Sequence, residues 1–454
     1  MINLSTSGFP SVSVYGRIRS VRPLPLAHFR HILAVFHNTG HMFDQFVAQL
    51  LLEVCADPGQ AVHEAAGRLD SKRIAFATGM EITWSVAVAL QLSENRRPAV
   101  LRPQDCQQVS IKGVMKMQAG VYTGVDTLKL QEWPKPKLDK GEMLVKVRYA
   151  GICGTDMMIH AGKHPRVVPP RVLGHEIFGT VVEVSPPVES QIKEGDRVAV
   201  FPLISCGRCA PCREGNAHVC EILGLLGIDT DGGFAEYVKV SPDQLIPVPS
   251  GVDDEQAALI EPLSVAVHVV RTSGFTAGDT ALVTGAGPIG NLITQVLTAA
   301  GARRVLISEA KAFRRDLAKR MGFAVVNPQE VKPTEAIREM SGEPFVDHVF
   351  EATGVAAAYR DAVQACKVRG HITFVGLPKT MPEVDVLNLV FKEIRTAGAR
   401  VYTPKDFLVA ISLLERGAID VKSVVTDNLS LKDIEVGLQR MHDPDHSLKI
   451  LFSL

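Results

Sequence analysis

The stretch "DTALVTGAGPIGNLITQVLTAAGARRVLISE", residues 279–309, most constrains how this 454-residue chain can fold. A β-rich run over 280–284 leads into a glycine-rich turn, an apolar helical stretch follows, and a second strand ends at Glu309. The alternation continues, since "VDHVFEATG" predicts a strand, residues 355–366 a helix and "GHITFVGL" the next strand. The sequence therefore predicts an α/β region with a doubly wound parallel sheet.

The turn in this unit carries a G-x-G-x-x-G pattern. It consists of Gly285, Gly287 and Gly290, with Pro288 and Ile289 between the last two glycines. Glycine is needed where the turn is tight and where backbone must approach a pyrophosphate, and the helix N-terminus adds free N–H groups and a favourable dipole. Glycine-rich turns are common, but a strand, glycines, a helix, a strand and an acid in this order predict a dinucleotide site.

The acid that ends the unit indicates which dinucleotide is used. Glu309 stands 19 positions after Gly290, where a carboxylate binds the ribose 2′-hydroxyl and would repel a 2′-phosphate. NAD is therefore predicted rather than NADP. Arg314, with Lys311 and Arg315 beside it, lies just beyond and keeps NADP open as the alternative.

Half of the eight cysteines lie in one polar loop, "SCGRCAPCREGNAHVCE", residues 205–221. Their spacing is C-x2-C-x2-C-x7-C, formed by Cys206, Cys209, Cys212 and Cys220. Thiolates two residues apart can turn inward around a tetrahedral cation, and four sulfurs close the zinc shell. The loop is predicted to hold a structural zinc. The alternative is two disulfides, which need an oxidising compartment that nothing in the sequence indicates.

A second metal site is predicted in "AGICGTDMMIHAGKHPRVVPPRVLGHEIFG", residues 150–179. Cys153, His175 and Glu176 offer a thiolate, an imidazole and a carboxylate, and a catalytic zinc needs three such ligands and one open position. By itself the triplet is a weak signal, because a buried cysteine and a structural histidine without any metal would give the same sequence pattern.

Composition limits the protein class. Lysine plus arginine and aspartate plus glutamate both number 49, hydrophobic residues make up 46% and charged residues 22%, which predicts a folded globular protein of two or three domains. Zero net charge gives no reason to expect a nucleic acid partner. The uncharged run 280–302 is interrupted by "GAGPIG", so no membrane span is expected, and the predicted location is the cytoplasm.

Several motifs occur together in a fixed order: "GICGTD", "GHEIFG", "GDRVAV", the four-cysteine loop, "DGGFAEY", "IEPLSVAVH" and "GAGPIG". In this combination residues 115–454 resemble the zinc-dependent medium-chain alcohol dehydrogenase family, nearest to its sorbitol, threonine and sugar-acid dehydrogenase branch. The resemblance implies a GroES-like β-rich catalytic domain split by a Rossmann domain. It places the catalytic domain at 115–264, the Rossmann NAD-binding domain at 265–404 and the return to the catalytic domain at 405–454.

Residues 1–114 match nothing in this family. Three interpretations stay open for them: an N-terminal extension with its own role, a fused fragment, or a start codon placed too far upstream.

The resemblance also implies residue roles. Cys153 and His175 match two catalytic zinc ligands, and Glu176 matches the third ligand of the polyol and threonine branch. Glu261 stands where classical alcohol dehydrogenases place a cysteine ligand, so whether Glu176 or Glu261 completes the set stays open. Thr155 resembles the hydroxyl that begins the proton relay. With the four-cysteine loop, two zinc ions per subunit are implied.

The implied reaction transfers a hydride from a secondary hydroxyl of a polyol or sugar acid to NAD. L-Threonine or a vicinal diol such as butanediol is the alternative substrate, although Met158 stands where threonine dehydrogenases carry a histidine. A non-catalytic nucleotide-sensing protein is the alternative of a different class, and the open zinc site favours an enzyme. A small-molecule substrate and a homo-oligomer, either a dimer or a tetramer, are expected.

Overall fold

A computed structural model describes residues 115–378, 380–443 and 445–454 of the chain. The predicted N-terminal extension, residues 1–114, lies outside the described residues, and its three interpretations stay predictions.

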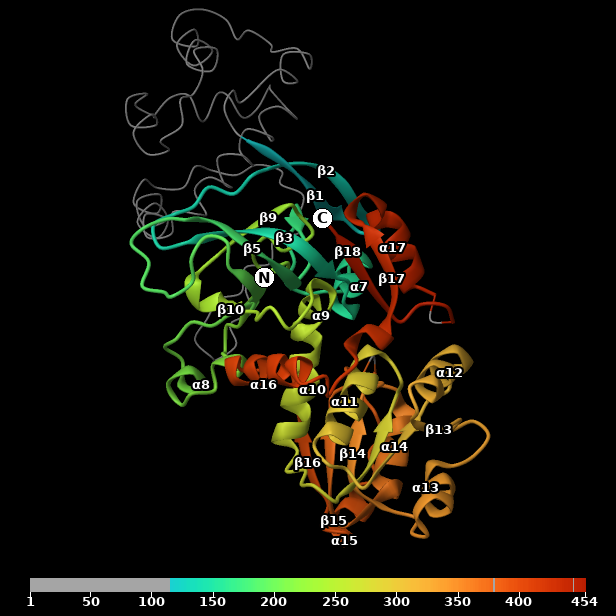
Figure 1. The fold of residues 1–454 in the computed structure, drawn as a ribbon. Coiled ribbons are helices and arrows are strands. Elements are labelled where there is room, and N and C mark those ends of the chain that lie inside the picture. Colours follow the sequence, from blue (N-terminus) through green and yellow to red (C-terminus); the bar gives the residue numbers. More distant parts are fainter. Residues whose placement is uncertain (1–114, 379, 444) are drawn as a thin grey trace, which may run out of the picture. The chain divides into compact units, whose positions relative to one another are not determined.

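The β-rich part is built on one mixed sheet in which β9 pairs with β3 and the other strands follow the order β10-β6-β5-β3-β18-β17 (Figure 1). Its strands are β3 (Met143–Gly151), β5 (Glu176–Val184), β6 (Arg197–Val200), β9 (Tyr237–Val240), β10 (Leu245–Pro247), β17 (Val425–Ser430) and β18 (Lys449–Ser453). The chain end thus completes the sheet that β3 begins. There are two smaller sheets in this part. One consists of β1 (Lys116–Gly124), β2 (Thr127–Pro134) and β4 (Arg171–Val172), and the other of β7 (Leu203–Ile204) and β8 (Gly224–Leu225).

The other part contains a six-stranded parallel sheet of order β13-β12-β11-β14-β15-β16. Its strands are β11 (Thr280–Thr284), β12 (Arg304–Ser308), β13 (Ala324–Val326), β14 (Val346–Glu351), β15 (Cys366–Phe374) and β16 (Arg395–Gly398). The strand order reverses between β11 and β14, which is the switch point where doubly wound sheets bind ligands. The predicted fold class, a GroES-like domain with a Rossmann doubly wound domain, is confirmed.

Helices cover both faces of the parallel sheet. They are α10 (Ile260–Thr272), α11 (Pro288–Ala299), α12 (Ala312–Arg320), α13 (Pro333–Ser341), α14 (Ala356–Ala365) and α15 (Val386–Phe391). The other described α-helices are α7 (Gly154–His160), α8 (Ala210–Arg213), α9 (Asp254–Ala258), α16 (Pro404–Glu415) and α17 (Ile434–Met441). Alternate residues of β11 face opposite sides: Ala281 and Val283 join the core of α10 and α11, and Leu282 joins that of α13 and α14. No helix in the described part of the chain is both long and apolar enough to cross a bilayer.

One continuous core joins the β-rich part to the parallel sheet. It contains Phe178 from β5, Val283 from β11 and the buried residues of α10, which packs against both α11 and α16. Asp406 of α16 is fully buried and accepts from His268 Nδ1 at 2.9 Å, and it also pairs with Arg271 of α10. Burial alone would raise the pKa of Asp406, but these contacts and the Thr403 hydrogen bonds hold it well below its usual range.

Candidate active site

The first predicted ligand, Cys153, precedes helix α7 as its N-cap residue. The carboxylate of Asp156, the third residue of the helix, accepts from the Cys153 backbone N–H at 2.9 Å, which fixes the turn. Thr155 Oγ1 lies 3.8 Å from Cys153 Sγ and is partly exposed. The "CGTD" motif therefore places a thiol and a hydroxyl side by side.

His175 and Glu176 lie at the start of β5, opposite the end of β3. Glu176 pairs with Gly151 in the sheet register, and a Cβ at Gly151 would overlap with the Glu176 carboxylate. Gly174 precedes the pair with a φ of 92°, in the left-handed region, and its Cα faces the Phe234 ring. The glycines of "GICG" and "LGHE" are thus needed to seat the buried imidazole and carboxylate.

The structure brings Cys153, His175 and Glu176 together, because one ligand atom from each lies within 4.8 Å of the others. His175 Nδ1 lies 3.8 Å from Asp156 Oδ1, and neither atom has a hydrogen-bond partner within the described residues. Burial would lower the pKa of His175, but the negative charges of Cys153 and Asp156 raise it well above its usual value. Three buried or half-buried ligand atoms that converge in this way suit a catalytic zinc.

Glu261 lies outside this triplet but close enough to act on it electrostatically. It is on α10, is 8% exposed and accepts a hydrogen bond from the Tyr402 hydroxyl at 2.5 Å. Burial and the neighbouring Glu176 carboxylate raise the pKa of Glu261 to about 7. Sequence reasoning missed Tyr402, because the contact arises only when α10 packs beside the segment before α16.

Sequence reasoning also missed Lys449 on β18. Its ammonium group forms an ion pair with Glu176 and donates to the Ile152 carbonyl at 2.7 Å, and the side chain is almost fully buried. Burial would lower the pKa of Lys449, but the Glu176 charge raises it. The available signal was a lysine inside the apolar run "LKILF", where an unpaired charge would be costly.

The four cysteines of the 205–221 loop form a compact cluster whose sulfurs all lie within 4.8 Å of one another. The sulfurs of Cys206 and Cys212 are 4.0 Å apart, and those of Cys209 and Cys220 are 3.8 Å apart. Sulfurs about 2.3 Å from a tetrahedral zinc are about 3.8 Å apart, whereas a disulfide requires about 2.05 Å. The six cysteines of the described residues are free thiols, so the disulfide alternative is not realised.

Backbone N–H groups lower the pKa of two of these thiols, Cys206 and Cys209, whereas burial raises the pKa of Cys212 to about 12. The N–H of Cys209 donates to Cys206 Sγ at 3.4 Å, and the N–H of Cys206 donates to Cys220 Sγ at 3.4 Å. Hydrogen bonds from the Arg208 and Cys209 amides lower the pKa of Cys206 to about 6. The loop is preorganised to hold a cation.

The G-x-G-x-x-G turn lies at the end of β11, at the switch point of the sheet. Gly285 has a φ of 95°, and a Cβ at Gly290 would collide with the Gly285 carbonyl oxygen. A Cβ at Gly287 would meet only Arg314 Nη1, at 3.8 Å, so this face of the turn is open. Pro288 and Ile289 form the first turn of α11, and Gly287 is its N-cap. The turn therefore leaves room for a pyrophosphate at a helix N-terminus.

Glu309 follows β12 and lies next to this turn. Its carboxylate accepts from the Ala286 N–H at 2.7 Å and from the Lys311 N–H at 2.7 Å. The carboxylate is thus fixed beside the glycines. Arg315 donates to the backbone carbonyls of Glu309 and Ala310 instead of pairing with the acid.

Comparison with known proteins agrees with this geometry. Residues 139–250 match the alcohol dehydrogenase GroES-like domain, and residues 288–416 match the zinc-binding dehydrogenase domain. A 2-dehydro-3-deoxy-L-galactonate 5-dehydrogenase of Pseudoalteromonas atlantica is 38% identical over 74% of this chain and 98% of its own. An L-threonine 3-dehydrogenase of Bacillus licheniformis is 36% identical over 68% of this chain and 90% of its own.

A solved structure is also similar. The alcohol dehydrogenase rspB of Escherichia coli CFT073, complexed with NADH, aligns with a TM-score of 0.70 and 32% identity over 75% of this chain and 100% of its own. The predicted zinc and nicotinamide cofactors and the predicted dehydrogenase activity are confirmed at the level of the family. The chain belongs to the zinc-binding alcohol dehydrogenase family with a GroES-like domain.

Proposed function

We propose that the protein oxidises a secondary hydroxyl of a polyol or sugar acid and transfers the hydride to NAD. The convergence of Cys153, His175 and Glu176 within 4.8 Å carries this proposal, because an open three-ligand site has no use in a binding protein. Relatives named for galactonate derivatives and sorbitol support the substrate class. L-Threonine or butanediol is the second candidate, since similar proteins carry those names.

The catalytic zinc would be held by Cys153, His175 and Glu176, with a fourth position left open. When bound, zinc supplies a Lewis acid that lowers the pKa of a hydroxyl group. The Asp156 carboxylate, 3.8 Å from Nδ1 of His175, would help to orient the ring. Glu261 accepts a hydrogen bond from Tyr402, and we assign it as a buried carboxylate near the metal site and not as the third ligand.

Thr155 is proposed to begin the proton relay. Its hydroxyl lies 3.8 Å from Cys153 Sγ, and its partial exposure gives it access both to a hydroxyl at the site and to water. It can accept the substrate hydroxyl proton and donate its own proton outward.

The dinucleotide would lie on the turn formed by Gly285, Gly287 and Gly290, with its pyrophosphate at the N-terminus of α11. Glu309 would accept from the ribose hydroxyls and repel a 2′-phosphate, which favours NAD over NADP. Arg314 would lie at the open face of Gly287, near the cofactor phosphates.

The four cysteines of the 205–221 loop are proposed to hold a structural zinc, which gives two zinc ions per chain. The sulfur separations of 3.8 and 4.0 Å and the amide donors to the sulfurs support this assignment. A thiolate cluster of this kind suits a reducing compartment, so we keep the cytoplasm as the proposed location.

A homo-oligomer is proposed through the edge strand β16. Among the described strands it pairs only with β15, and each of its four residues is exposed. Beside it in sequence, α15 exposes Val386, Leu387, Val390 and Phe391 by 62–75%. An unpaired strand edge and an apolar patch favour association of two copies. The mass of the full-length chain by light scattering tests this, and a monomer at micromolar concentration would count against it.

The predicted domain limits also stay a proposal. The limit at 264/265 falls within α10, which packs on both parts, and the limit at 404/405 falls at the start of α16. Limited proteolysis of the purified chain tests whether cleavage between the parts occurs near these helices.

The proposed activity is tested by NAD reduction with full-length protein against hexitols, aldonic acids, L-threonine and butanediol. Cys153→Ser should abolish turnover, and Cys366→Ala, which removes a buried thiol on β15, should retain it. Turnover of L-threonine alone would favour the second candidate. If the protein binds zinc and NAD but oxidises none of these substrates, it would instead be assigned as a nucleotide-sensing protein.

A further inference from the structure

A pocket of about 730 Å³ lies in the described part of the chain, within the range of about 300–1,000 Å³ typical of small-molecule sites. Three segments line it: His164 and Arg166 from the loop after α7, residues 220–224 with Asp229 from the region after the four-cysteine loop, and Arg400 before α16.

Each segment that lines this pocket is connected along the chain to a residue at or next to the candidate active site. The loop with His164 and Arg166 connects Cys153 to His175. The second wall continues to Gly227, whose Cα packs against the Gly174 backbone, next to His175. Arg400 lies two residues before Tyr402, which donates to Glu261. Besides burial and the Arg166 charge, the His175 charge also lowers the pKa of His164, which places this side of the pocket near the three-ligand site.

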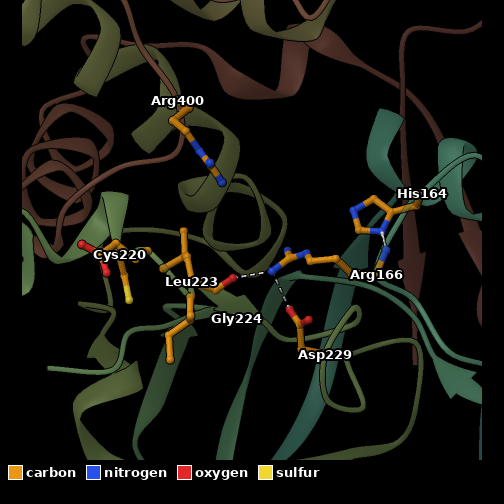
Figure 2. A pocket seen from close by; sticks show the side chains of 9 residues that line it. His164, Arg166, Cys220, Leu223, Gly224, Asp229 and Arg400 are labelled. Carbon is orange, nitrogen blue, oxygen red and sulfur yellow. Dashed lines mark hydrogen bonds and ion pairs between the residues drawn. The ribbon is translucent and has the colours of Figure 1, made fainter. Parts of the chain in front are cut away.

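The pocket presents two guanidinium groups from opposite walls (Figure 2). Arg166 is fixed by the Leu223 carbonyl and by Asp229, whose Oδ2 lies 3.4 Å from Nη1. Asp229 also accepts from the Leu225 N–H at 2.8 Å, so that carboxylate is already engaged. Arg400 has no hydrogen bond or ion pair with any described residue. Its positive charge is therefore available to a ligand.

His164 adds a neutral donor to the same pocket. Its Nδ1 accepts from the Arg166 backbone N–H at 3.4 Å, so the proton of the neutral ring lies on Nε2. Burial and the Arg166 charge lower the pKa of His164, which keeps the ring neutral. The pocket thus offers two cations and one neutral N–H group. Of the two acids that line it, Asp229 is paired with Arg166, and Glu221 is exposed.

We propose that this pocket binds the carboxylate end of the substrate, so that the enzyme selects a sugar acid over the corresponding neutral polyol. Arg400 is the specificity-determining residue, and Arg166 and His164 complete the carboxylate site. The inference rests on the proposed function and narrows its substrate class. A guanidinium matches a carboxylate with two parallel hydrogen bonds and an opposite charge, whereas the terminal hydroxymethyl of a hexitol is uncharged and has only one oxygen to accept such a bond.

The test compares hexonates with hexitols of the same configuration, using NAD reduction by the full-length zinc-loaded enzyme. Arg400→Gln should raise the KM for the hexonate about ten- to hundredfold and change the KM for the hexitol less than about twofold. Arg400→Lys should give an intermediate KM, because it retains the charge but loses the fork geometry. Arg320→Gln, at an exposed position on α12, removes one positive charge elsewhere and should leave both KM values unchanged.

The outcomes separate this inference from the proposed function. Equal changes for hexonate and hexitol in Arg400→Gln would overturn the carboxylate site while the dehydrogenase activity stands. A higher KM for NAD with an unchanged hexonate-to-hexitol ratio would assign Arg400 to the dinucleotide and also overturn it. If the wild-type enzyme oxidises no substrate of either class, the proposed function fails and the inference fails with it. Melting temperatures show that each variant is folded.

Discussion

Lys449 of the last strand, β18, forms a buried ion pair with Glu176 of β5, the proposed zinc ligand. Both residues are 2% exposed, so neither charge is solvated and each depends on the other. The C-terminal strand thus supplies the countercharge of the candidate active site. This relationship couples the folding of the chain end to the electrostatics of the metal ligands.

Replacing this lysine should destabilise the zinc-free protein. Lys449→Met leaves the Glu176 carboxylate buried without a partner, which should lower the free energy of unfolding by about 3 kcal/mol. Urea unfolding of chelator-treated protein measures the change. Lys449→Arg keeps the positive charge, so its free energy of unfolding should fall less. Equal decreases in the two variants would show that packing, and not charge, accounts for the stabilisation.

The two glutamates should differ in their effect on zinc content. Glu176→Gln removes a carboxylate of the 4.8 Å triplet, so it should lose one zinc ion per chain together with activity. Glu261→Gln should retain both ions but lose about ten- to hundredfold in kcat/KM, because Glu261 lies outside the triplet and pairs with Tyr402. Zinc content by mass spectrometry decides the matter, and loss of zinc in Glu261→Gln would reverse the two roles.

Removing one sulfur of the 205–221 loop should affect stability more than chemistry. Cys209→Ser should reduce the zinc content from two ions to one per chain and lower the melting temperature, because the cluster holds the loop by metal coordination. Cys366→Ser, a matched loss of a thiol outside the loop, should keep both ions. A zinc content that stays at two in Cys209→Ser would disprove the structural site.

Local sequence patterns predicted much of the fold and the site. The strand at 280–284 occurs as β11, and the helix predicted at 355–366 occurs as α14. The three candidate ligands meet as the motifs "CGTD" and "GHE" imply, because a short loop and one register pair, Gly151 with Glu176, bring them together. These features depend on short-range rules of periodicity and turn geometry.

Contacts between distant segments could not be predicted in this way. Tyr402 reaches Glu261 only because α16 packs against α10, and Lys449 reaches Glu176 only because β18 pairs with β3. Arg166 and Arg400 likewise line one pocket from distant positions in the sequence. No spacing rule joins such residues, since their proximity is set by tertiary packing.

Glu309 should control the choice of dinucleotide. Its carboxylate is fixed beside the glycine turn by the Ala286 and Lys311 amides, so it cannot turn away from a 2′-phosphate. Glu309→Gln removes the repulsion and should raise kcat/KM for NADP relative to NAD more than about tenfold. Steady-state kinetics with both cofactors measure the ratio. Glu330→Gln, an exposed acid after β13, is the control, and an unchanged ratio in Glu309→Gln would contradict the assignment.

The contact between α10 and α16 should make the stability of the fold depend on pH in the acidic range. Asp406 is fully buried against His268 and Arg271, and its pKa is held well below the ordinary value of 3.8. The folded state therefore keeps the carboxylate charged where the unfolded chain binds a proton, so this stabilisation is complete above pH 3.8 and declines as the pH falls below it.

Asp406→Asn should consequently lose about 3 kcal/mol of unfolding free energy at neutral pH, and the difference from the wild type should narrow as the pH falls below the ordinary carboxyl pKa. Denaturant unfolding between pH 7 and the lowest pH at which the fold persists measures this difference. Asp433→Asn, at an exposed position, should show little loss at any pH. A gap between Asp406→Asn and the wild type that stays constant with pH would mean that the carboxylate contributes by shape and hydrogen bonding rather than by its charge.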